Sequence, residues 1–224
     1  MAFRTSWPAV CKLRVMALLM PVVALLATAA IAGVNEDLVK AAGRGDQPEV
    51  KRLVAEGADV NAKSNSGRTA LLYASMKGHL EVVRELLSRG AEVNAQDNYG
   101  WTALMWASLN GHREVVQEML NKGAEVNAQE KEGWTALISA SQNGHREIVQ
   151  ELLSKGAELN AQDNVGKTAL IWASLNGHRE VVQELLGEGA EVNVKDNGGK
   201  TALIWASEKG HQEVKELLIK AGAK

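Results

Sequence analysis

The chain has 224 residues, a formal net charge of −2 and 46% hydrophobic residues, the balance of an ordinary folded protein. This composition argues against a disordered chain and against several membrane spans. The small net charge disfavours a protein that coats nucleic acid, and the single cysteine excludes an intramolecular disulfide.

The first 32 residues have the three parts of a secretory signal peptide. Three basic residues within the first 14 positions precede an uncharged run, residues 15–35, whose later part is rich in small side chains. We predict a signal peptide over 1–32 with cleavage between Ala32 and Gly33; an alternative site follows residue 29. Cleavage would remove three basic residues and no acid, so the net charge would fall from −2 to −5.

The alternative to cleavage is a retained membrane anchor, because the apolar run approaches the roughly 20 residues that a span needs. Pro21 and the alanine-rich second half of the run favour cleavage. The sequence therefore predicts an exported protein, periplasmic or secreted, with no membrane attachment once the signal is removed. The absence of cysteine from residues 33–224 agrees with an oxidising compartment.

The rest of the chain is one unit copied at a period of 33 residues. Two motifs define the register, Thr-Ala-Leu and Gly-His. The threonines are Thr69, Thr102, Thr135, Thr168 and Thr201, and the histidines are His79, His112, His145, His178 and His211. We predict an N-terminal capping unit over 33–63, full units over 64–96, 97–129, 130–162 and 163–195, and a C-terminal capping unit over 196–224.

Each full unit is predicted to hold two short helices. In residues 97–129, Thr102 is a good N-cap for a helix over 103–110, and a second helix follows over 113–122. Residues 125–128 are expected to be extended. The capping unit 33–63 should place its helices at 37–42 and 49–54. A single unit cannot bury its own apolar face, so neighbouring units must stack into a continuous core.

The pattern Asp97-x-x-Gly100-x-Thr102-Ala-Leu104, continued by Gly111-His112 and Asn127, resembles the ankyrin repeat. The resemblance extends over residues 34–224. It implies an all-α solenoid of stacked helix-turn-helix repeats with short β-hairpin fingers. It also implies protein binding through the fingers and the concave helix face.

No catalytic, cofactor-binding or metal-binding residue is predicted. The histidines occur once per unit, roughly 8–10 Å apart, whereas the ligands of one metal ion lie about 2 Å from it. The repeated threonines and histidines are instead expected to be structural, each histidine tying its turn to a neighbouring unit. Without an asymmetric constellation of reactive groups, we predict a monomeric, non-enzymatic protein with no cofactor, small-molecule substrate or nucleic-acid partner.

The candidate partner-binding residues fall in two groups. One group is expected to line the concave helix face: Tyr73, Trp106, Leu109, Asn110, Trp172, Leu175 and Trp205. The other lies in the predicted fingers: Asn98, Tyr99, Trp101, Lys131, Glu132, Trp134, Val165 and Lys167.

The tryptophans could bind a partner or fill gaps between units. For Trp101 and Trp134 we predict surface contact, because sister units carry arginine or lysine at this place. For Trp106, Trp172 and Trp205 both roles stay open.

Three functions are compatible with this pattern. The first is a scaffold that binds one specific protein of unknown identity. The second is a general holdase whose groove protects partly folded envelope proteins. The third is a membrane-tethered adaptor, which requires that the N-terminal segment is retained.

Overall fold

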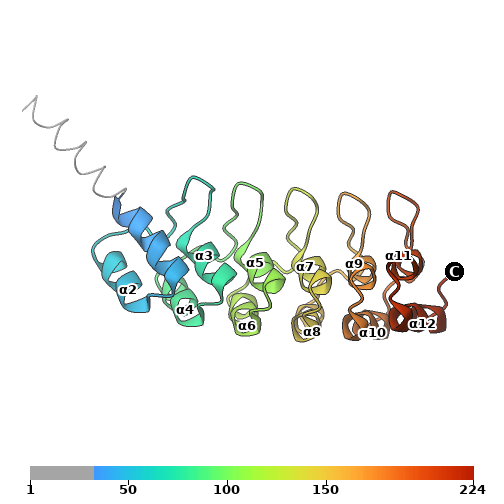
Figure 1. Ribbon diagram of the computed structural model, residues 1–224. Helices are drawn as coiled ribbons and strands as arrows, with labels where there is room; N and C mark the ends of the chain where they lie inside the picture. The colour runs from blue at the N-terminus through green and yellow to red at the C-terminus, as the bar shows by residue number, and fades with distance from the viewer. Residues whose placement is uncertain (1–32) are drawn as a thin grey trace, which may run out of the picture.

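The computed structural model describes residues 33–224, and their helices are stacked in pairs along one axis (Figure 1). The first helix includes residues 33–44 and is followed by α2 (Gln47–Ala55). The inner helices of the next five units are α3 (Ala70–Lys77), α5 (Ala103–Leu109), α7 (Ala136–Gln142), α9 (Ala169–Leu175) and α11 (Ala202–Lys209). Their outer partners are α4 (Leu80–Ser88), α6 (Arg113–Asn121), α8 (Arg146–Ser154), α10 (Arg179–Gly187) and α12 (Gln212–Lys220).

A threonine cap begins every inner helix from α3 onward. The Thr102 Oγ1 atom accepts a hydrogen bond from the backbone N–H of Met105 at 3.3 Å, and the same bond recurs at the other four repeated threonines. This bond satisfies one of the backbone donors that a helix start leaves without a partner. The 33-residue spacing of the threonines thus sets where each inner helix begins.

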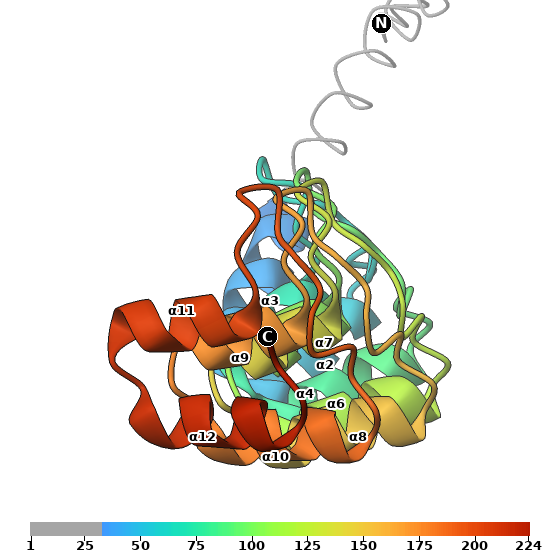
Figure 2. The ribbon, with the colours of Figure 1, turned by 90° about the vertical axis from the view of Figure 1, so that its right-hand side faces the viewer.

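The core runs without a break along the stack. Each outer helix buries one face, which in α6 consists of Val115, Val116 and Met119. The inner helices α3, α5, α7 and α9 bury most of their length, and helices of one layer contact the equivalent helices of the neighbouring units. The all-α solenoid predicted from the sequence is confirmed. Viewed along the axis, long loops rise at a steep angle from the two helix layers (Figure 2).

We call these loops the fingers and define them by their tips, residues 64–68, 97–101, 130–134, 163–167 and 196–200. They follow a hairpin path, but no strand occurs in residues 33–224. The expected β-hairpins are therefore not formed as regular strands. Residues 125–128, predicted to be extended, form a turn in which the Ala128 N–H donates to the Glu125 carbonyl at 3.3 Å.

The finger backbone also bonds to the neighbouring finger. The N–H of Asn98 donates to the Ser66 carbonyl at 3.1 Å, and equivalent bonds of 2.9–3.0 Å join each later pair of fingers. In three of the four pairs a side-chain amide adds a second bond, for example from Asn98 to the Asn65 carbonyl at 3.0 Å. The fingers thus form a continuous row and not independent loops.

The first unit departs from the expected arrangement. Its first helix, predicted over 37–42, is already helical at residue 33, so helix occupies the positions at which later units form a finger. The predicted signal peptide, with Ala32 of its cleavage site, lies outside the described residues. Among residues 33–224 no helix is both long and apolar enough to span a bilayer.

Candidate functional site

The histidines fix the spacing of the units from the side opposite the finger tips. The Nε2 atom of His112 bonds to the carbonyl of Met76 in the preceding unit at 3.1 Å, and the other four histidines make the same bond at 2.8–3.2 Å. A carbonyl oxygen only accepts, so Nε2 must carry the proton. Each bond reaches back to the end of an inner helix, and this keeps the concave face in register.

Four tryptophan side chains lie in contact along the angle between the fingers and the inner helices. The ring centroids of Trp101 and Trp106 are 4.6 Å apart, those of Trp101 and Trp134 are 6.4 Å apart, and those of Trp134 and Trp172 are 5.0 Å apart. Tyr73 and Trp205 continue the row at its two ends. Tilted pairs at such distances are favourable by about 0.5–1.5 kcal/mol each beyond the area they bury.

Cationic side chains complete the row where a finger lacks tryptophan. The Arg68 guanidinium lies 4.6 Å from the Trp106 ring centroid and 5.8 Å from that of Tyr73. The Lys167 ammonium lies 4.4 Å from Trp172 and 4.8 Å from Trp205. Lys200 covers the outer side of Trp205 at 4.3 Å. We call the resulting nine-residue row the ladder: Arg68, Tyr73, Trp101, Trp106, Trp134, Lys167, Trp172, Lys200 and Trp205.

A simple offset generates the ladder. The residue at the base of each finger lies between the inner helix of its own unit and that of the next unit, as Lys167 lies between Trp172 and Trp205. In residues 130–162 the inner helix carries the buried Ser139 in place of a ring. The contact between Trp101 and Trp134 bridges this gap, and Trp134 contacts Trp172 of the next unit. The row is therefore continuous across five units.

Acidic side chains behind the ladder hold it in place. Asp163 and Asp196 accept hydrogen bonds from the indole N–H groups of Trp172 and Trp205, both at 2.8 Å. Burial alone would raise the pKa of Asp196, but bonds from the Lys200 backbone N–H and the Trp205 indole outweigh it and lower the pKa overall. The carboxylate is thus charged at neutral pH.

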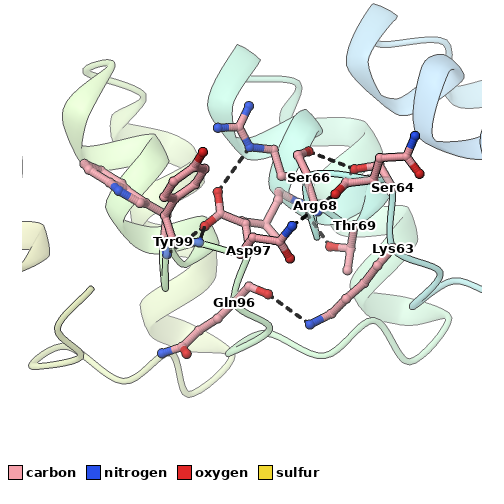
Figure 3. Close-up of polar contacts among 12 residues, drawn as sticks. Lys63, Ser64, Ser66, Arg68, Thr69, Gln96, Asp97 and Tyr99 are labelled. Atoms are coloured by element: carbon pink, nitrogen blue, oxygen red, sulfur yellow. Dashed lines mark hydrogen bonds and ion pairs between the residues drawn. The ribbon is translucent and has the colours of Figure 1, made fainter. Parts of the chain in front are cut away.

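In the unit 97–129 the equivalent acid, Asp97, has a different partner. The fully buried Asp97 carboxylate pairs with Arg68, Nε to Oδ2 at 3.1 Å, as the close-up shows (Figure 3). Because Arg68 takes the oxygen that an indole takes in the sister units, the Trp106 Nε1 atom is buried without a hydrogen-bond partner among the described residues. Trp106 is held instead by stacking against Arg68 and Trp101.

The predicted partner-binding residues occupy three environments. The five ladder tryptophans are half-buried, and Trp101 and Trp134 pack on the core while keeping part of their surface exposed. Leu109 and Leu175 are half-buried beside the ladder, and Asn110 is exposed. On the finger tips Tyr99 is 62% exposed and Val165 is 50% exposed.

The other finger residues divide by role. Lys131 and Glu132 are exposed on the tip of their finger. The side-chain amide of Asn98 donates a hydrogen bond to the neighbouring finger. Asn98 therefore stabilises the row of fingers as well as forming part of its surface. Lys167, predicted to give specificity, belongs to the ladder.

Sequence reasoning missed two members of the ladder and the acids behind it. The sequence shows Arg68 and Lys200 only as cations at the place of Trp101 and Trp134, and Asp97 only as part of the repeat pattern. One signal in the sequence could have indicated the ladder: the finger-base position alternates between tryptophan and a cation. Both kinds of side chain pack on an aromatic face, and the inner helices supply such rings.

Among residues 33–224, no three histidine, cysteine or acidic side chains cluster closely enough to hold a metal ion. The chain matches the family model of ankyrin repeats (three copies) over residues 38–130, 89–163, 127–196 and 162–224. These matches together cover most of the chain. The protein therefore belongs to the ankyrin-repeat family. No curated protein sequence matches it significantly.

Proposed function

We propose that this protein is an exported, non-enzymatic scaffold that binds a protein partner over the ladder and the finger tips. The observation that supports it is the ladder itself. Six aromatic side chains and three cations lie half-exposed in one row, held by stacking on one another and by hydrogen bonds to buried carboxylates. Aromatic and arginine side chains in such settings dominate protein interfaces.

The ladder is ordered before any partner arrives. Its rings stack on one another, its acids are hydrogen-bonded, and the fingers are joined from one unit to the next. Little side-chain entropy is then lost on binding, so more of the contact energy appears as affinity. Tyr99 and Val165, which project from the finger tips, would contribute to the choice of partner.

The test exploits substitutions that the chain already contains. Trp101→Lys with Trp134→Lys places at both fingers the residue found at Lys167 and Lys200, so the fold should tolerate it. Truncation to alanine is less suitable, because both rings pack on the core. We expect the double variant to bind the natural partner at least about tenfold more weakly, a loss of about 1.4 kcal/mol.

The experiment is affinity capture of the tagged full chain and of this variant from the envelope fraction of the source cell. Glu114→Gln with Glu147→Gln is the matched control, because it makes the same charge change at exposed sites of the outer helices. Recovery of the chain in the envelope fraction would support export. Equal capture by all three proteins would refute binding through the ladder, and equal capture of many clients would favour a holdase.

A further inference from the structure

The finger row has a vacant edge at its N-terminal end. Every finger from 97–101 onward donates a backbone N–H to a carbonyl of the finger before it. Within residues 33–224 the finger 64–68 has no such neighbour, because residues 33–35, which correspond to residues 66–68, are part of a helix. The backbone N–H and the side-chain amide of Asn65, which correspond to the two donors of Asn98, have no acceptor among residues 33–224. In Figure 1 the first helix leans away from this edge.

A cavity of about 820 Å³ lies at this edge. Its walls are the first helix, residues 63–66 of the first finger, and Tyr73, Met76 and Lys77 of α3. This volume is within the roughly 300–1,000 Å³ of typical ligand sites. The cavity is deep at Gly43 because this residue has no side chain. The equivalent residues of the later units all have one: Met76, Leu109, Gln142, Leu175 and Glu208.

The charge of the cavity differs from that of the protein. Lys40, Lys63 and Lys77 line it, against one acid, Glu36. Lys40 pairs with Glu36 at 2.7 Å, and Lys63 donates to the neutral Gln96 carbonyl at 3.0 Å (Figure 3). The Lys63 ammonium thus points to the neighbouring unit, and Lys77 is the one lysine of the cavity with neither an acid nor a hydrogen-bond partner among residues 33–224, in a chain of net charge −2.

We propose that this cavity binds an extended, acidic peptide segment that takes the place of the missing first finger. Two consecutive carbonyl oxygens of the segment accept from the Asn65 N–H and side-chain amide, as the Ser66 and Asn65 carbonyls accept from Asn98. A carboxylate of the segment meets the Lys77 ammonium. This is strand addition to a free edge, in which main-chain bonds give affinity and side-chain pockets give selectivity.

A second copy of this chain fits the edge less well. Its last finger, 196–200, presents the required carbonyls, but stacking it here would bring its α11 and α12 onto the space of residues 33–44 and α2. A separate extended segment carries no such helices. This peptide site is separate from the ladder of the proposed function, so an experiment can refute either one and leave the other standing.

Variants for the test again come from sister units. Gly43→Leu fills the cavity with the residue found at Leu109; a Cβ at Gly43 meets nothing closer than 3.8 Å, so the helix accepts it. Lys77→Asn places the asparagine found at Asn110. Lys209→Asn makes the same change at the equivalent position of the last unit and is the matched control.

The probe is a displayed library of random heptapeptides selected against the full chain. We expect selected peptides rich in Asp and Glu that lose at least tenfold in affinity to Gly43→Leu and Lys77→Asn. Affinity for Lys209→Asn and for Trp101→Lys/Trp134→Lys should stay within twofold. Hydrogen exchange of the Asn65 amide should slow at least tenfold when peptide is bound.

Three results would overturn the proposal: no acidic enrichment, equal binding to Gly43→Leu, or unchanged exchange at Asn65. Concentration-dependent self-association that Gly43→Leu abolishes would assign the cavity to a second copy and also overturn it. Loss of peptide binding in the tryptophan variant alone would move the site to the ladder.

Discussion

Replacing Ser75, Ser108, Ser141 and Ser174 by alanine together should raise the free energy of unfolding by at least about 4 kcal/mol. These four serines occupy one position of successive inner helices, and each hydroxyl is fully buried without a hydrogen-bond partner among residues 33–224. A buried unsatisfied polar group costs about 1–3 kcal/mol, and alanine also has the higher helix propensity. Equilibrium urea unfolding followed by circular dichroism measures the gain.

Ser139→Ala is the control for this gain. Ser139 is equally buried, but its hydroxyl donates to the Thr135 carbonyl at 2.9 Å. We expect no stabilisation from this substitution, since it removes a satisfied group. If Ser139→Ala stabilised the protein as much as Ser108→Ala, the unpaired hydroxyl would not be the cause of the effect.

Gly111→Ala should lower the free energy of unfolding by about 2–4 kcal/mol. Gly111 has φ +77°, in the left-handed region, and a Cβ there would lie 2.6 Å from the His145 ring. The ring would have to move and would lose its bond to the Leu109 carbonyl. The loss of stability therefore has two parts, the backbone strain at residue 111 and the lost contact between two units.

Gly210→Ala separates these two causes. Gly210 has the same conformation, φ +76°, but nothing lies within 4 Å of the Cβ position. We expect a loss of only about 1–2 kcal/mol from backbone strain. Chemical denaturation of both variants gives the comparison, and equal losses would show that the histidine contact contributes nothing to coupling.

The sequence was sufficient for the repeat architecture because its information is periodic. The spacing of the threonine caps sets where inner helices begin, and the structure confirms the all-α stack. The period does not contain the lateral offset between neighbouring units. For that reason the sequence could not show that Trp134 contacts Trp172 of the next unit, or that Arg68 lies between Tyr73 and Trp106.

The first unit was the hardest to predict, because its motifs are degenerate. Asp37 looked like a helix start equivalent to Ala70, yet the helix already includes residue 33. Neither helix propensity nor period shows that a finger is missing there. The free edge at Asn65 follows only from the bonds between fingers, which join residues about 33 positions apart.

Partner contact with the ladder can be measured directly, because all tryptophans of residues 33–224 belong to it. Trp7 is the one other tryptophan of the chain, so the full chain carrying Trp7→Phe emits from the ladder alone. Acrylamide quenching of this emission, with and without the captured partner at saturation, tests whether the partner covers the ladder. Binding over the ladder predicts that the quenching constant falls by at least about half, since half-exposed rings become buried. A saturated complex with unchanged quenching would contradict it.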